Sequence, residues 1–125
     1  MAPFKFDPSA SGLRKTLKEY QELALRFLWE VGEEGANSGD VWRAVNGRLG
    51  EGRSISRASV IFFLNDMVDD GVLGFREATG KGGRHRVYFP AMDEAGYCRY
   101  LLRTVIESMM RDFPGETREV LGEYR

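Results

Sequence analysis

Five basic side chains lie where they could bind a phosphate backbone or a base edge. Two flank the start of an expected helix and three fall in or directly after the glycine-rich stretch TGKGGRH: Arg53, Arg57, Lys81, Arg84 and Arg86. Cations give nucleic-acid affinity by neutralising phosphates, and an arginine can also bind the O6 and N7 atoms of guanine together. The chemistry that these residues favour is therefore the binding of nucleic acid.

A helix followed by two strands must position these cations. Ser56 is suited to cap the helix, because its hydroxyl can accept a hydrogen bond from an amide two or three residues further on. The helix is predicted to end at Gly71. Its buried face holds four residues: Val60, Phe63, Leu64 and Met67. Strands are predicted over residues 72–76 and 86–89, with the basic TGKGGRH loop between them.

Two helices are predicted before this one. Thr16 and Glu19 have the spacing of a capping box, and apolar residues then recur at helical intervals up to Gly32. Ser38 is predicted to cap the second helix, which ends at the sequence GEG over residues 50–52.

The first fifteen residues are rich in proline, serine and glycine. They are expected to form an extended arm that is ordered only if the rings of Phe4 and Phe6 find a pocket.

A long helix is predicted over residues 93–113. Its apolar residues come in adjacent pairs every three to four positions, which makes a stripe too wide for one contact. The members of this stripe are Tyr97, Cys98, Leu101, Leu102, Val105, Ile106, Met109, Met110 and Phe113. The stripe favours burial against the chain's own domain on one flank and a second copy on the other, as a dimer interface. The alternative is a helix that lies across its own domain alone.

Length and composition are those of one globular domain. The chain has 125 residues, a formal charge of −1 and one cysteine. The charge argues against a protein that coats nucleic acid through basicity alone, and a single cysteine excludes an intrachain disulfide. There is no secretory signal pattern and no apolar run long enough to cross a bilayer, so we expect a cytoplasmic protein without a membrane partner.

These elements together predict a mostly helical α+β fold, a winged helix-turn-helix with a long C-terminal dimerisation helix. The expected parts are an N-terminal arm at residues 1–15, a winged-helix DNA-binding domain at 16–92, and the dimerisation helix with a tail at 93–125.

Two segments resemble the penicillinase repressor family. The run ELALRFLWEVG at residues 22–32 is similar to that family's first-helix signature, with Leu28 and Trp29 as its Leu-Trp pair. The run SRASVIFFLNDMVDDGVL at residues 56–73 is similar to the family's recognition helix, and the YFP sequence at 88–90 fits the exit from the wing. The resemblance implies a homodimeric repressor that places its third helix in the major groove of a pseudo-palindromic operator.

The chain departs from that family in the middle of the third helix. Ile61 and Phe62 stand where members commonly have a lysine and a threonine, and Asp66, Asp69 and Asp70 occupy later positions that are commonly basic. Exposed apolar groups on such a helix could contact thymine methyl groups in DNA, or they could pack against the N-terminal arm or another protein.

Each candidate residue has an expected role. Arg57 is expected to contact a base, and Ser56 and Ser59 lie at the same helix start, where a base edge or a phosphate is within reach. Ser38 and Arg53 are better suited to phosphates. A solvated side chain is the alternative for Arg57 and for the three wing cations, and a hydrogen bond to its own backbone is the alternative for Ser59.

No enzymatic constellation is present in the sequence. It has no nucleophile with a plausible base, no phosphate-binding glycine loop between a strand and a helix, and no spacing of metal ligands around its one histidine, His85. We therefore expect a transcriptional regulator that binds double-stranded operator DNA as a homodimer, without a metal or cofactor. The alternative is a winged-helix protein-interaction module that does not read DNA.

Overall fold

The computed structural model describes residues 4–125, and these residues divide into two compact units with a boundary between Asp93 and Glu94. Across the described residues, the N-terminal unit contains three α-helices and a three-stranded sheet, and the C-terminal unit contains two α-helices. These elements form the mostly helical α+β fold that the sequence predicts, and the order of the helices and strands is consistent with a winged helix-turn-helix.

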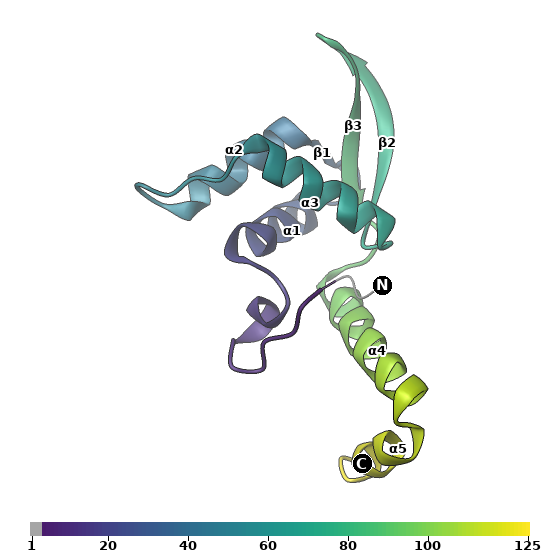
Figure 1. Cartoon of the computed structure of the whole chain (residues 1–125). Helices are drawn as coiled ribbons and strands as arrows, with labels where there is room; N and C mark the ends of the chain where they lie inside the picture. The colour runs from purple at the N-terminus through teal and green to yellow at the C-terminus, as the bar shows by residue number, and fades with distance from the viewer. Residues whose placement is uncertain (1–3) are drawn as a thin grey trace. The chain divides into compact units, whose positions relative to one another are not determined.

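Three helices form the core of the N-terminal unit: α1 (Glu19–Val31), α2 (Ser38–Leu49) and α3 (Arg57–Asp69) (Figure 1). Each helix turns one apolar face inwards. The largest fully buried side chains on these faces are Leu25, Leu28, Val41, Val45, Val60 and Leu64. Burial of apolar surface, at about 25 cal/mol per Å², is the main force that holds the three helices together.

Both ends of α3 confirm the prediction. The Ser56 hydroxyl accepts a hydrogen bond from the Ser59 amide at 3.1 Å. At the other end Gly71 has a φ of +80°, and the next amide, that of Val72, donates to the carbonyl of Met67 at 2.9 Å. The predicted inward residues of this helix are all buried.

The start of α1 differs from the prediction, because Thr16 does not cap it. The preceding residues form a separate 3-10 turn, η1 (Gly12–Lys15), and α1 begins at Glu19. The amide of Lys18 donates to the side chain of Gln21 at 2.8 Å, which is one half of a capping box. Burial of Leu13 and Leu17 anchors the extra turn, so the helix starts three residues after the predicted cap.

The start of α2 is shifted by one residue. Its cap is Asn37, whose side-chain oxygen accepts from the Asp40 amide at 2.8 Å, and Ser38 is the first helical residue. Asn37 belongs to a short strand, β1 (Ala36–Asn37), which pairs with a later strand and holds the residue in the extended conformation that a cap requires.

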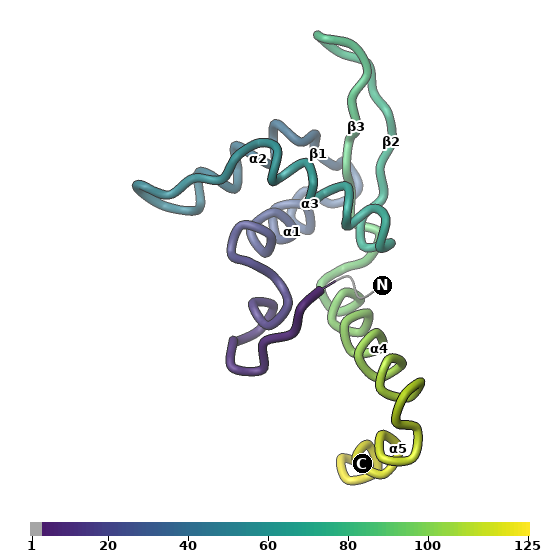
Figure 2. Tube along the Cα trace, viewed as in Figure 1, coloured from purple at the N-terminus to yellow at the C-terminus, as the bar shows by residue number. Residues whose placement is uncertain are grey.

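The hairpin of β2 (Leu73–Gly80) and β3 (Gly83–Pro90) is longer than predicted, and it projects beyond the helices of its unit (Figure 2). Its strands are antiparallel and in register up to the pair of Gly80 and Gly83. Gly82 and Gly83 have φ values of +91° and +101°, which L side chains rarely adopt. The turn is therefore shorter than the predicted TGKGGRH loop and comprises Lys81 and Gly82. Arg84 lies on β3 together with Arg86, which was predicted on a strand. With β1, the sheet has the order β1-β3-β2.

The N-terminal segment is more compact than the predicted arm. The Asp7 amide donates to the Lys15 carbonyl at 2.7 Å, which folds the segment back on itself. Phe4 is half-buried and Phe6 is exposed, and both line an open pocket of about 490 Å³. Residues 1–3 of the predicted arm lie outside the described residues.

The C-terminal unit consists of α4 (Glu94–Asp112) and α5 (Pro114–Gly122). The predicted long helix is confirmed to within one residue at each end. At Phe113 the backbone leaves the helix, with φ −136° and ψ 61°, and Pro114 takes the first position of α5. The sequence predicted only a tail here, because proline was interpreted as a stop although it is also favoured at a helix start. Among the described residues, no helix is long and apolar enough to span a membrane.

Candidate nucleic-acid interface

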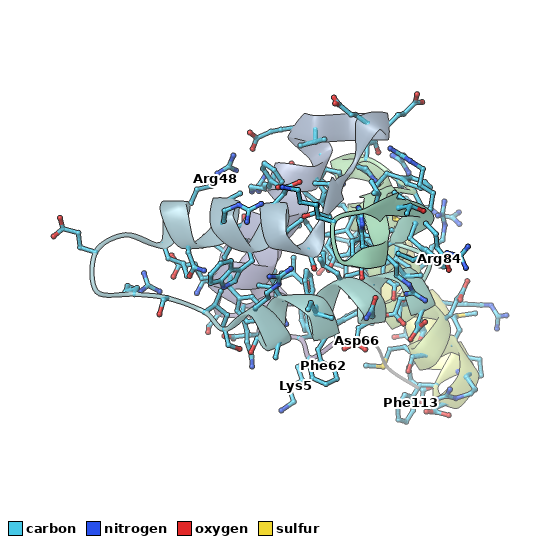
Figure 3. All side chains as sticks on the ribbon, turned by 90° about the horizontal axis from the view of Figure 1, so that it is seen from above. Lys5, Arg48, Phe62, Asp66, Arg84 and Phe113 are labelled. Atoms are coloured by element: carbon cyan, nitrogen blue, oxygen red, sulfur yellow. The ribbon has the colours of Figure 1, made fainter. Side chains whose placement is uncertain are left out.

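One face of α3 is directed away from the core. It comprises Arg57, Ala58, Ile61, Phe62, Asn65, Asp66 and Asp69, which recur at the three- and four-residue intervals of one helical face. We call this set the outer α3 face. Figure 3 shows Phe62 and Asp66 projecting from one side of the unit and Arg48 of α2 from the opposite side. The outer α3 face begins with a cation, continues with apolar side chains and ends with acids.

The start of α3 is held in place by two side chains of α2. The indole nitrogen of Trp42 donates to the Ile55 carbonyl at 2.9 Å, and the Ile55 amide donates to the side-chain oxygen of Asn46 at 2.8 Å. Both polar groups of the residue before Ser56 are thus bound, which fixes the chain as it enters α3. This role of Trp42 and Asn46 is not predicted from the sequence. A polar Asn in mid-helix and a Trp, whose N–H needs an acceptor when buried, were its only signals.

Arg57 lies where the starts of α2 and α3 approach each other. Its Nη2 atom is 3.3 Å from the position that a Cβ atom on Gly39 would occupy, and Nη1 of Arg43 is 3.5 Å from the same position. Gly39 is buried in the first turn of α2, so its lack of a side chain leaves room for the guanidinium group of Arg57. Arg43 is paired with Asp40 at 2.6 Å.

Arg57 has no hydrogen-bond or ion-pair partner among the described residues. Every other arginine from Arg26 to Arg86 has one: a carboxylate for Arg26, Arg43, Arg48, Arg53 and Arg84, and a carbonyl or amide oxygen for Arg76 and Arg86. Helix starts carry partial positive charge, so the position of Arg57 is unfavourable for a cation in the free protein. An anion bound there would be stabilised by the guanidinium groups and by the helix starts together.

The neighbouring candidates are partly engaged. Ser56 donates its hydroxyl to the Ser59 hydroxyl at 2.9 Å in addition to capping the helix. Arg53 is bound to Glu19, and this hydrogen bond lowers the pKa of the Glu19 carboxyl. Ser38 is half-buried at the first position of α2. Of these four residues, Ser38 presents a hydroxyl at the start of α2 that can bind a phosphate. Arg53 can bind a phosphate only if its ion pair with Glu19 breaks.

The three wing cations are in different environments. Lys81 is exposed in the two-residue turn, and Arg84 pairs with Glu77 across the hairpin at 3.0 Å, with both side chains largely exposed. Arg86 instead donates to the side-chain oxygen of Asn65 at 3.0 Å, and its guanidinium carbon lies 3.9 Å from the centre of the Phe75 ring. Arg86 therefore connects the wing to α3.

Asn65 is the residue on α3 that receives this connection. Its side-chain oxygen also accepts the Tyr88 hydroxyl at 2.7 Å, and Tyr88 is 3% exposed. Burial raises the pKa of the Tyr88 phenol, which keeps it protonated and able to donate. One oxygen of α3 thus binds two donors of β3, and the orientation of the wing depends on it.

The last turn of α3 is acidic. Burial raises the pKa of Asp70, and the nearby charges of Asp66 and Asp69 raise it further. Negative charge is also disfavoured at the C-terminal end of a helix, which carries partial negative charge. This end of α3 therefore repels phosphates, in contrast to its start.

In the C-terminal unit, much of the predicted dimer stripe is exposed. Leu102 is 61% exposed, Met109 47% and Phe113 54%, while the other predicted members, apart from the buried Tyr97, are half-buried. Tyr97 stacks on Tyr100 with ring centroids 5.9 Å apart. A groove of about 320 Å³ lies between α4 and α5 and is lined by Met109, Phe113, Glu116, Thr117, Val120 and Leu121.

No group of three or more His, Cys, Asp or Glu side chains among the described residues is arranged to hold a metal ion.

No protein-family model matches the chain, and no curated protein matches it. The part of the resemblance that the structure carries is the fold alone, three helices followed by an antiparallel hairpin, compatible with a winged helix.

Proposed function

We propose that this chain is a sequence-specific DNA-binding transcriptional regulator that acts as a homodimeric repressor. The observation that carries the proposal is the guanidinium group of Arg57, which has no hydrogen-bond or ion-pair partner among the described residues and lies where the starts of α2 and α3 approach each other. A folded protein gains nothing from a cation in that position, whereas a phosphate or a guanine edge would satisfy it.

The wing supports the same function. Lys81 has no hydrogen-bond or ion-pair partner in residues 4–125. The ion pair of Arg84 with Glu77 is exposed, so it contributes about 0–1 kcal/mol to stability and can be exchanged for a phosphate. In this proposal Lys81 and Arg84 hold the backbone, and Arg86 orients the wing through Asn65.

The test is to select bound duplexes from a randomised pool and from genomic fragments with the full-length protein. A regulator of this kind enriches one inverted-repeat motif. The logarithm of its binding constant falls linearly with the logarithm of salt concentration, with a slope of about −0.9 for each phosphate contact. Recovery of no motif, with binding that is weak and independent of salt, would refute the proposal.

The dimer is proposed to form through the C-terminal unit, because exposed apolar side chains on α4 and α5 surround the groove between them. Replacing Leu102 and Met109 together with lysine should convert dimers to monomers in sedimentation experiments without unfolding the chain, since both side chains are already exposed. A full-length protein that is monomeric at micromolar concentration would contradict this part.

A second function is favoured by one observation. Phe62 is 72% exposed and is followed on the outer α3 face by two acids, a surface that would suit a basic, apolar protein partner. As a protein-interaction module the chain would bind that partner with little dependence on salt, and DNA would not compete for Phe62.

A further inference from the structure

The middle of the outer α3 face offers a base few hydrogen-bonding groups, because only the hydroxyl proton of Ser59 and the N–H donors of Asn65 remain for one. Ser59 and Ser56 share a hydrogen bond between their hydroxyls, and the side-chain oxygen of Asn65 is occupied by two donors from β3. An asparagine reads adenine by accepting from N6 and donating to N7 at once, so an oxygen already bound twice removes that mode. Asp66 and Asp69 can only accept.

Between Arg57 and the acids, the exposed surface of α3 consists mainly of hydrocarbon side chains. Ala58 and Phe62 are exposed and Ile61 is half-buried, so these three side chains form one apolar patch on adjacent turns of the helix. In the major groove the one base feature that an apolar side chain can remove from water is the C5 methyl group of thymine.

We infer that α3 reads thymine methyl groups through Phe62 and Ile61, and that thymine is therefore required in each half of the operator. The inference rests on the proposed function. DNA is favoured as the occupant of the patch because cations lie on the elements that adjoin it: Arg57 and Arg43 at the starts of the helices, and Lys81 and Arg84 on the wing, which Arg86 and Tyr88 bind to α3 through Asn65. Both groups complement the phosphates that flank a groove.

The acids at the end of α3 sharpen this specificity. Because Asp66 and Asp69 repel phosphates, the helix lacks the sequence-independent attraction that cations on this face would supply. Contacts with the methyl groups then account for a larger share of the binding free energy at the correct site.

The experiment uses the full-length protein and the best duplex obtained from the randomised pool. Each thymine of a half-site is replaced in turn by uracil, which lacks only the methyl group. We expect one or two positions at which uracil weakens binding about fourfold, the factor that corresponds to about 0.8 kcal/mol for one buried methyl group. Equal affinity for thymine and uracil at every position, or a selected site with no thymine, would overturn the inference.

Two variants then assign the contact to a side chain. With Phe62→Ala the thymine and uracil duplexes should bind equally at the position read by Phe62, because a methyl group contributes only where a partner covers it. Phe6→Ala is the matched control, since it removes another exposed ring, 56% exposed against 72% for Phe62, from the N-terminal segment and should keep the fourfold ratio. A full ratio retained in Phe62→Ala would also overturn the inference.

The experiment distinguishes failure of the proposed function from failure of methyl reading. If the folded protein selects no duplex at all, the proposed function itself fails, and Phe62 belongs to a protein interface. If the protein binds an operator tightly but is indifferent to uracil, the proposed function stands and methyl reading is excluded. Comparing duplexes on the unaltered protein needs no substitution, so the result does not depend on any variant folding.

Discussion

Replacing Arg57 with alanine should weaken DNA binding while leaving the protein as stable as before, or more stable. Arg57 has no partner among the described residues, so its removal leaves no carboxylate or carbonyl unpaired. It also removes a cation from two helix starts, an interaction of about 0.3–1 kcal/mol for a partly exposed charge. Alanine is also the better helix former by a few tenths of a kcal/mol. We expect the free energy of unfolding to rise by up to about 1 kcal/mol.

The effect on binding has the opposite sign. A bidentate contact with guanine contributes about 1–3 kcal/mol, so the affinity for the best duplex should fall by about five- to 150-fold. The preference at one base pair of each half-site should relax at the same time. Fluorescence anisotropy with the selected duplex measures the affinity, urea unfolding measures the stability, and a repeated selection measures the preference.

Arg48→Ala is the control for this experiment. Arg48 is also an exposed helix arginine, but it is bound to Glu30 through two hydrogen bonds, and it projects from the side of the unit opposite to Phe62 and Asp66 (Figure 3). Its removal should lower stability slightly and leave DNA affinity unchanged. If Arg57→Ala instead destabilises the protein and binds DNA as tightly as before, Arg57 is a structural residue and the proposed interface is misplaced.

Three further outcomes are expected. Asn65→Leu should destabilise the protein by about 1–3 kcal/mol in urea unfolding, because it leaves the buried hydroxyl of Tyr88 without an acceptor. A change within experimental error would show that the hydrogen bonds from β3 to Asn65 do not stabilise the fold. Replacing Lys81 and Arg84 with alanine should weaken binding to all duplexes alike and reduce the salt slope by about two, whereas loss of sequence preference would show that the wing reads bases. Asp70→Asn should stabilise the protein at neutral pH, since a pKa raised by folding means that the ionised carboxyl is disfavoured in the folded state. That gain should disappear as the pH falls towards the ordinary aspartate value of 3.8, and a gain that persists there would contradict the charge argument.

Local signals in the sequence sufficed for the third helix. Ser56 and Gly71 were correct as its limits because a cap hydroxyl and a left-handed glycine act on amides and carbonyls within four residues. The buried residues of this helix were predicted correctly for the same reason, since the period of 3.6 residues is a property of the helix itself. The long helix α4 was likewise found from its own periodicity.

Local sequence signals did not predict the structure where the same residues are compatible with two conformations. Glycines in TGKGGRH indicate a loop, but pairing with the neighbouring strand holds all but two of the residues between Leu73 and Pro90 in a ladder. Pro114 ends α4 and starts α5, and the sequence alone favoured only the first of these. Asn37 and Ser38 are both good caps, and the pairing of β1 with β3, which are far apart in the chain, selected Asn37.

The chemistry of the candidate site is divided in the same way. The sequence by itself determined which side chains stand on the outer face of α3 and at the tip of the wing, because helical and strand periods assign faces without knowledge of the rest of the fold. Only the tertiary structure decided which of those side chains are free to bind. Arg53 is bound by Glu19 and Arg86 by Asn65, across 34 and 21 residues of chain, while Arg57 has no partner within the described part of the chain and lies beside Gly39. Such contacts depend on how distant elements pack, and no local period in the sequence encodes them.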